Sequence, residues 1–260
     1  MDRKHSEDRA RQRRAKGTRP SPFVVTVDIV LMTILRGELR IFLVQRGNRP
    51  HLGEWALPGG PVMSSEPLEE AALRIVDEEA GIPPAPGHLE QLGAYGDPAR
   101  DPDMRVVTVA YWAVAPLLSP AYFDRGLAEK STAIYAEFVP VPEIESGRLR
   151  LAFDHARIVA DALDQVRSRL ETTTLARRFC PPEFTISQLR EVYEAVWGMR
   201  LDAANFQRKV LQSDGFVAPL EKWRRSTGRR GRPARLWVAE DAGYGRLERP
   251  FRGAWREGGG

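Results

Sequence analysis

The sequence is almost without cysteine. Cys180 is the single cysteine among 260 residues, which excludes an intramolecular disulfide framework, and one thiol alone does not make a metal site. No apolar run approaches the length of a membrane-spanning helix. The N-terminal residues are too polar for a secretory signal. We therefore expect an intracellular, cytoplasmic protein.

The chain also has little net charge, but that charge is unevenly distributed. The formal net charge is +4. Basic residues gather toward the two ends of the chain, whereas acidic residues gather between positions 66 and 79. This asymmetry suggests an anionic partner for the ends. Because the length exceeds that of a typical domain and 42% of the residues are hydrophobic, we expect two domains with packed cores.

Residues 1–20 form a polar, basic segment without apolar periodicity, so we expect them to be disordered. A solubilising tail and a non-specific DNA-contacting arm are equally consistent with this composition. Residues 21–170 then form the pattern of one α/β domain, an α/β/α sandwich, with a connecting helix. Runs of β-branched residues predict strands, and a stripe of apolar residues four apart predicts a helix that Asp154 caps. The predicted strands are 23–35, 39–45, 89–95, 106–114 and 134–139, and the predicted helix is 153–170.

A glycine-rich turn followed by an acidic helix is the most informative stretch. Gly59 and Gly60 make the turn, and the helix after them is ended by Gly81 and two prolines. Glu78 and Glu79 are adjacent carboxylates late in this helix. Hard oxygen ligands around a Mg²⁺ ion that keeps some of its waters suit a diphosphate substrate.

This stretch, from Gly60 to Ile82, resembles the Nudix box. Every fixed position of that pattern matches except one, because Ile75 stands where a Glu should follow Arg74. The alternative, an ordinary amphipathic helix after a turn, does not account for eight matches at the required spacing. In the family the missing Glu serves as metal ligand or general base. The resemblance therefore implies weak Mg²⁺ binding at Glu78 and Glu79. It also implies absent or feeble hydrolysis, with Glu66, Glu78 and Glu79 as the remnant of the catalytic set, and Ile75→Glu should raise turnover.

Candidate ligand-binding residues surround this box. Arg46 follows the second predicted strand; in the Nudix fold a residue in this place often meets a substrate phosphate, although a solvated arginine is an equal alternative. The charged loop between the strands at 89–95 and 106–114 could bind ribose hydroxyls and phosphates. The predicted ligand-binding set is Arg46, Gly59, Gly60, Arg74, Asp97, Arg100 and Arg105.

Residues 171–245 show a different pattern. Thr185 or Ser187 can cap one helix, and Asp202 can cap a second. Two short strands, at 216–219 and 234–238, flank a basic glycine-rich loop. Helix, turn, helix, strand, basic loop and strand together outline a winged helix-turn-helix domain. The predicted DNA contacts are Asn205, Arg208, Lys209 and Gln212 on the second helix and Arg229, Arg230, Arg232 and Arg235 around the loop.

The whole arrangement resembles the Nudix-related transcriptional regulators (NrtR-like family). The resemblance rests on stretches such as RVVTVAYWAVAP, FDHARIVADAL, PPEFTISQLREVYEAVWG and GRPARLW. It implies a dimeric, nucleoid-associated repressor of NAD or sugar metabolism genes that senses ADP-ribose or a related nucleotide. An active Mg²⁺-dependent ADP-ribose pyrophosphatase with an accessory basic domain is the alternative. Residues 246–260 are expected to be a flexible tail.

Overall fold

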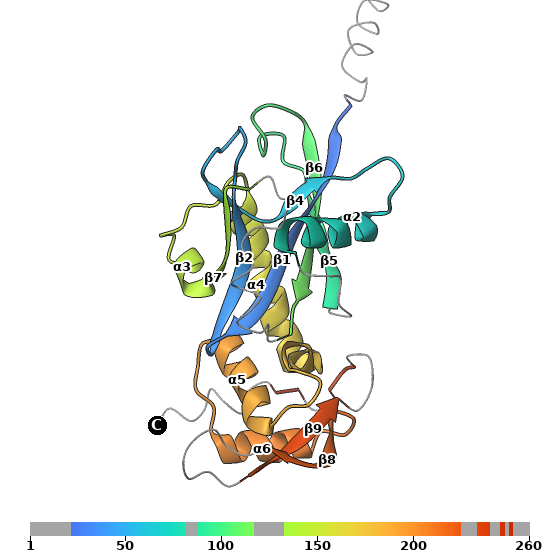
Figure 1. Cartoon of the computed structure of the whole chain (residues 1–260), viewed down its shortest axis with the longest axis vertical. Helices are drawn as coiled ribbons and strands as arrows, with labels where there is room; N and C mark the ends of the chain where they lie inside the picture. The colour runs from blue at the N-terminus through green and yellow to red at the C-terminus, as the bar shows by residue number, and fades with distance from the viewer. Residues whose placement is uncertain are drawn as a thin grey trace, which may run out of the picture.

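The computed structural model describes residues 22–81, 88–116, 133–224, 233–239, 245–247 and 250–251. Figure 1 shows an elongated molecule in which a lobe built on a β-sheet lies above a smaller, mainly helical lobe. Within the described residues, no helix has the length and apolar character needed to cross a membrane.

The sheet of the upper lobe is organised around β1 (Val24–Leu35). One edge of β1 pairs in parallel with β6 (Val106–Val114), and β6 in turn pairs with β5 (His88–Tyr95). The other edge changes partner along its length. Its first half pairs with β4 (Gly59–Pro61) and its second half with β2 (Glu38–Gln45). This change of partner opens the sheet edge beside β4. Two further strands, β3 (Trp55–Ala56) and β7 (Tyr135–Pro140), both pair with β2.

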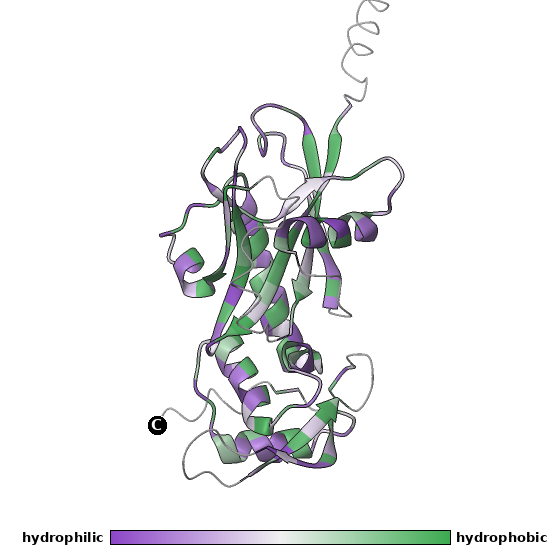
Figure 2. Ribbon diagram, in the orientation of Figure 1, coloured by the Kyte–Doolittle hydropathy of each residue, from purple (hydrophilic) through white to green (hydrophobic). Residues whose placement is uncertain are grey.

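Helices cover both faces of this sheet. Successive side chains of β1 point to opposite faces, and residues 27–34 are all buried, so each face needs a cover. Val27, Ile29 and Leu31 pack against α2 (Leu68–Ile75) and the π-helical turn η1 (Val76–Ala80). The residues between them point to the opposite face, where α4 (His155–Thr172) and the short α3 (Val141–Glu145) pack. Figure 2 shows the apolar residues running along the strands between these helices. The predicted α/β/α sandwich is confirmed.

The start of α4 differs from the prediction. Asp154 occupies the N-cap position, but its side chain makes no capping hydrogen bond. Its carboxylate instead accepts hydrogen bonds from the guanidinium of Arg100, 54 residues earlier in the chain. A tertiary ion pair has replaced the local cap.

The lower lobe has the predicted winged helix-turn-helix order. After the 3₁₀ turn η3 (Leu175–Phe179) come α5 (Ile186–Trp197), α6 (Ala203–Leu211), β8 (Val217–Arg224) and β9 (Ala234–Ala239). Thr185 forms a capping box with Gln188 at the start of α5, and the Asp202 side chain accepts from the Asn205 N–H at the start of α6. The predicted caps of both helices are thus present, with Thr185 rather than Ser187 capping α5.

One core joins the two lobes. Ile158, Val166 and Leu170 of α4 lie in the same buried cluster as Tyr193 of α5 and Phe206 of α6. Leu247 and Phe251 belong to this cluster too, at 5% and 0% exposure. Expecting a flexible tail from residue 246 was therefore wrong for these two residues. Phe251 stacks on Tyr193, with ring centroids 5.0 Å apart.

Candidate functional site

A small pocket opens where β1 exchanges β4 for β2. Arg46, Asn48 and Leu57 line it together with Gly59 of β4 and Glu79 of η1. Three of the residues predicted from the sequence, Arg46, Gly59 and Glu79, are thus brought to one place although they are up to 33 positions apart. The pocket presents one cation and one carboxylate next to exposed backbone.

Arg46 is held at this pocket by its surroundings. Its Nε–H donates to the carbonyl of Pro50 at 2.9 Å, and its guanidinium lies 4.7 Å above the centre of the Phe153 ring. Phe153 itself has a positive φ of 54°, a strained conformation for a bulky residue. Burial lowers the pKa of Arg46, against the opposing charges of Asp101 and Asp28. The side chain is therefore a partly desolvated cation fixed over an aromatic ring, suited to bind an anion.

Gly59 is required here because Asp28 lies against it. A Cβ atom added to Gly59 would stand 2.1 Å from Asp28 Oδ1 and 2.9 Å from the Val27 carbonyl oxygen. Asp28 is a buried carboxylate in the middle of β1, 6% exposed. Gly60, by contrast, would place a Cβ at an ordinary 3.5 Å from Ile75 Cδ1. The close approach at Gly59 thus keeps Asp28 directly behind the pocket.

Arg100 pairs with this buried carboxylate. Its Nη2 donates to Asp28 Oδ2 at 3.3 Å and to Asp154 Oδ1 at 2.8 Å, and its side chain is 5% exposed. Burial alone would lower the pKa of Arg100, but the hydrogen bonds from Arg100 to Asp154 and the charge of Asp28 outweigh it and raise the pKa. Arg100 therefore joins β1 to the start of α4 behind the pocket and does not line the pocket itself.

His155 completes this buried group. Its Nδ1 accepts the Leu57 N–H at 3.0 Å, and its Nε2 lies 3.7 Å from Asp28 Oδ2. Burial lowers the pKa of His155, even though Asp28 opposes that effect. Because Nδ1 is an acceptor and the ring is neutral, the proton sits on Nε2, facing Asp28. The ring fixes the backbone of Leu57 in the pocket wall.

Arg74 and two box carboxylates hold the box together. Arg74 binds Glu66 through Nε and Nη2 at 2.9 and 2.7 Å, Glu78 through Nη1 at 2.9 Å, and the Pro61 carbonyl oxygen at 3.0 Å. The bonds from Arg74, and then the one from the Met63 N–H, hold the pKa of Glu66 at about 2. The expected diphosphate contact by Arg74 has no support in this geometry, because its guanidinium ties the glycine turn to the helix.

Ile75 faces the core and offers no ligand atom. It is 2% exposed and packs in the cluster that contains Val27 and Tyr111. Glu78 is already paired with Arg74, so Glu79 is the box carboxylate that lines the pocket. Among the residues that the structure describes, no group of three or more His, Cys, Asp or Glu could hold a metal ion. Within this described part of the chain, the carboxylates of the box therefore do not make a complete Mg²⁺ site.

Asp97 and Arg105 lie apart from the pocket. The Asp97 carboxylate accepts from the Ala99 N–H at 2.8 Å, which forms a local turn. Arg105 donates to the carbonyl oxygens of Gly96, Asp97 and Val106. Both residues stabilise the loop that contains Arg100. Neither lines the pocket, although the sequence predicted that both contact the ligand.

The predicted DNA-contacting residues divide into four groups. Asn205 and Arg208 are exposed on α6, and Gln212 is exposed at its C-cap. Lys209 is not fully outward as expected, because it is half-buried with its ammonium 4.8 Å from the centre of the Phe251 ring. Arg235 is engaged inside the β8–β9 hairpin with Glu221 and the Leu220 carbonyl oxygen. Arg229, Arg230 and Arg232 lie outside the residues that the structure describes.

Sequence reasoning missed the buried part of the site. Asp28, Phe153 and His155 are central to it, and so is Asp154 in its role as the partner of Arg100. A signal was available for Asp28, which is the one charged residue in the apolar run VVTVDIVLM. A charge inside a buried strand needs a partner, and so marks a site. No comparable local signal identifies His155.

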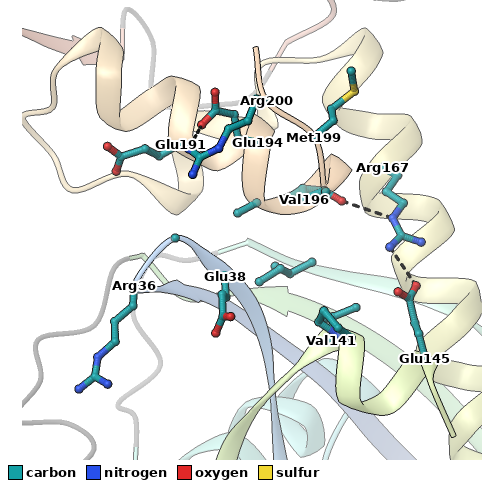
Figure 3. Close-up of a pocket in the computed structure, with 15 residues that line it drawn as sticks. Arg36, Glu38, Val141, Glu145, Arg167, Glu191, Glu194, Val196, Met199 and Arg200 are labelled. Atoms are coloured by element: carbon teal, nitrogen blue, oxygen red, sulfur yellow. Dashed lines mark hydrogen bonds and ion pairs between the residues drawn. The ribbon is translucent and has the colours of Figure 1, made fainter. Parts of the chain in front are cut away.

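A second cavity, of about 480 Å³, lies between the two lobes. Figure 3 shows the β1–β2 turn on one side of it and α5 on the other. Arg167 of α4 spans this junction, since its Nη2 binds Glu145 at 2.9 Å and its Nε donates to the Val196 carbonyl oxygen at 3.4 Å. The cavity marks where the lobes meet with incomplete packing.

Comparison with known proteins gives a consistent result. A NUDIX domain model matches residues 23–162, and a model of the NrtR DNA-binding winged helix domain matches residues 176–238. An ADPR responsive transcriptional repressor, NtrR, from Acinetobacter baylyi is 32% identical over 200 residues, covering 76% of each chain. An ADP-ribose pyrophosphatase from Methanocaldococcus jannaschii is 34% identical over 128 residues, covering 49% of this chain and 68% of the relative. Shewanella oneidensis NrtR, in a crystal structure with a 27mer DNA, superposes with a TM-score of 0.72. That match has 29% identity and covers 87% of this chain and 98% of the other.

Proposed function

The chain belongs to the Nudix family, in the group of repressors that carry an NrtR winged helix domain, and on that basis we propose that it is a DNA-binding transcriptional repressor that responds to ADP-ribose. The observation that carries this proposal is the combination, in one chain, of a Nudix pocket with an incomplete acidic box and a winged helix whose second helix exposes Asn205 and Arg208. We further propose that it controls genes of NAD metabolism or of sugar and nucleotide metabolism. The effector in this proposal is ADP-ribose or a related nucleoside diphosphate.

We assign effector binding to residues 21–170 and DNA binding to residues 171–245 together with Leu247 and Phe251. In the first part, Arg46 provides the partly desolvated cation for a diphosphate, and Gly59 leaves backbone open beside it. In the second part, the Asp202 N-cap and buried Phe206 fix α6 so that its polar face is presented to a duplex.

Hydrolysis is the second candidate function, favoured by the similarity to an ADP-ribose pyrophosphatase. Two features of the box oppose it. Ile75 has no oxygen to bind a metal or accept a proton, and Arg74 already engages Glu66 and Glu78. Any Mg²⁺ held by Glu79 and Glu78 would be weakly bound, so we propose that cleavage of ADP-ribose is absent or feeble.

One pair of assays separates the two functions. Purified protein is incubated with ADP-ribose and Mg²⁺ while AMP release is followed, and the same preparation is tested for a gel shift on its own promoter with and without ADP-ribose. We expect a shift that ADP-ribose changes, and little AMP. Rapid AMP release with no shift would make the protein a pyrophosphatase.

We also propose a symmetric homodimer on a pseudo-palindromic operator. A single α6 offers few base contacts, and a two-fold dimer doubles them at half-sites about one helical turn, or a multiple of it, apart. Analytical ultracentrifugation tests this, alone and with operator DNA. A monomer under both conditions would contradict it.

A further inference from the structure

The orientation of α6 is fixed by two buried side chains. Phe206 and Val210 are both 0% exposed, and the Phe206 ring lies 5.4 Å from that of Tyr193 and 5.9 Å from that of Phe251, measured between centroids. When one side of a helix packs against an aromatic cluster, the orientation of the helix in its lobe is fixed, and its opposite side faces a defined direction. The residues on that opposite side can therefore be identified from the helical period.

That opposite face carries a stripe of two apolar residues around one arginine. Ala204, Arg208 and Leu211 follow one another at four and three positions, which places them on one line of the helix. All three are exposed, Leu211 at 47%. No acidic residue occurs between Asp202 and Asp214. The face that meets the DNA is thus cationic at its centre and apolar beside it.

Arg208 is braced for a directed contact. Its Nη2 donates to Asn205 Oδ1 at 2.9 Å, one turn earlier on the same helix. This bond leaves its other N–H donors available and limits the side-chain freedom that would be lost on binding. A bidentate contact with the O6 and N7 atoms of guanine is the typical use of such an arginine in the major groove.

We propose that α6 recognises a guanine through Arg208 and the C5-methyl group of a neighbouring thymine through Leu211, with Ala204 leaving room for close approach to the groove. Thymine is the base that offers an apolar group in the major groove, and an exposed leucine next to the reading arginine complements it. This inference rests on the proposed function, because it requires the chain to bind specific duplex DNA.

The test replaces thymine by deoxyuridine, which removes the methyl group and leaves every hydrogen-bonding atom. The full chain first selects duplexes from a random library, and each thymine of the selected duplex is then replaced in turn. We expect one position in each half-site at which the replacement weakens wild-type binding by about 3- to 5-fold, the effect of one buried methyl group. Leu211→Ala should bind the thymine duplex more weakly by a similar factor and should show no further loss with deoxyuridine there.

Leu52→Ala is the matched control, because Leu52 is also an exposed leucine, at 54%, and lies in the other lobe. It should retain the full sensitivity to deoxyuridine. A selected duplex at which no deoxyuridine replacement matters overturns the inference, as does a Leu211→Ala protein that remains as sensitive as the wild type. Failure to select any sequence would overturn the proposed function and this inference with it.

Discussion

At the residue scale, Arg100 is the side chain whose loss should cost most. Removing it leaves Asp28 and Asp154 without their shared partner, and Asp28 is 6% exposed. Breaking a buried ion pair on one side typically destabilises a protein by about 3–5 kcal/mol. We expect Arg100→Ala to lower the free energy of unfolding by about that amount in urea titrations.

Arg157→Ala is the control for this measurement. Arg157 is 73% exposed and 4.0 Å from Asp161, so its loss should change the free energy of unfolding by less than about 1 kcal/mol. Equal effects of the two variants would show that Arg100 is not buried between its carboxylates in solution.

His155 should make stability depend on pH. Burial holds its pKa below the ordinary value of 6.5 in the folded protein. Below pH 6.5 the unfolded chain therefore binds a proton that the folded chain does not, and stability falls as the pH drops. We expect the difference in unfolding free energy between pH 7.5 and 5.5 to be smaller in His155→Gln than in the wild type.

The pH dependence of stability should become smaller in His155→Gln but should not disappear, because burial also lowers the pKa of His88. His51→Gln serves as the control, since His51 is a more exposed ring that pairs with Glu54 on the surface. If His155→Gln keeps the whole pH dependence of the wild type, the neutral buried imidazole is not its source.

Ile75 shows which features of the site can be predicted from the sequence and which cannot. The motif alone predicts that a carboxylate is missing at this position. That Ile75 packs in the core, and that Arg74 engages both Glu66 and Glu78, depends on how the glycine turn folds back on the helix. The expected gain of turnover in Ile75→Glu stays a prediction, to which the structure adds a stability cost, because the new carboxylate would enter an apolar cluster.

At the scale of elements, substitutions in α6 and in the β8–β9 hairpin should affect DNA binding in different ways. Arg208 is exposed on α6, so Arg208→Ala should cost about 1–3 kcal/mol on the operator and relax preference at one base pair. Arg230 belongs to the glycine-rich loop of the wing, outside the described residues. Arg230→Ala should weaken binding to all sequences alike and lower the salt slope by about 1 unit.

Salt titrations of the operator and of random DNA with both variants distinguish these roles. If both lose operator affinity with unchanged salt slope and unchanged specificity ratio, the division between helix and hairpin is wrong. If neither loses affinity, this lobe does not bind DNA in the proposed way.

Elements governed by local chemistry were predicted best. The caps of α5 and α6 depend on residues a few positions apart, and both helices begin where Thr185 and Asp202 indicate. The second half of β8 was missed. Three of its residues at 221–224 are charged, which does not predict a strand, and the segment is extended because it pairs with β9. Asp154 failed as a cap because Arg100, distant in sequence, binds its carboxylate.

At the scale of the whole molecule, the two lobes were predicted as separate domains but share a core. Short apolar segments such as the one around Leu247 and Phe251 give no periodic signal, yet both residues are buried where α4 ends. The Leu247 N–H donates to the Thr172 carbonyl oxygen at 2.8 Å, and Trp197 Nε1 donates to the Arg167 carbonyl oxygen at 3.4 Å. The far end of α4 is therefore part of the winged helix lobe.

This continuity leads to a prediction for ADP-ribose. The helix α4 begins beside the pocket, where Arg100 holds Asp154 and His155 supports Leu57, and it ends in the core of the DNA-binding lobe. A ligand that binds the folded chain stabilises it by about 2.7 kcal/mol at 100 times its Kd. Because the lobes share one core, that stabilisation should extend beyond the pocket.

Hydrogen exchange can measure how far it extends. We expect ADP-ribose to slow exchange of amides in α4 and α5 as well as in the strands around the pocket, since opening the shared core exposes all of them. Arg46→Ala, which removes the proposed anion contact, should abolish the effect in both lobes together. Protection confined to residues before 153 in the wild type would mean that the lobes open independently. In that case binding of ADP-ribose at the pocket would not stabilise the lobe that contains α6.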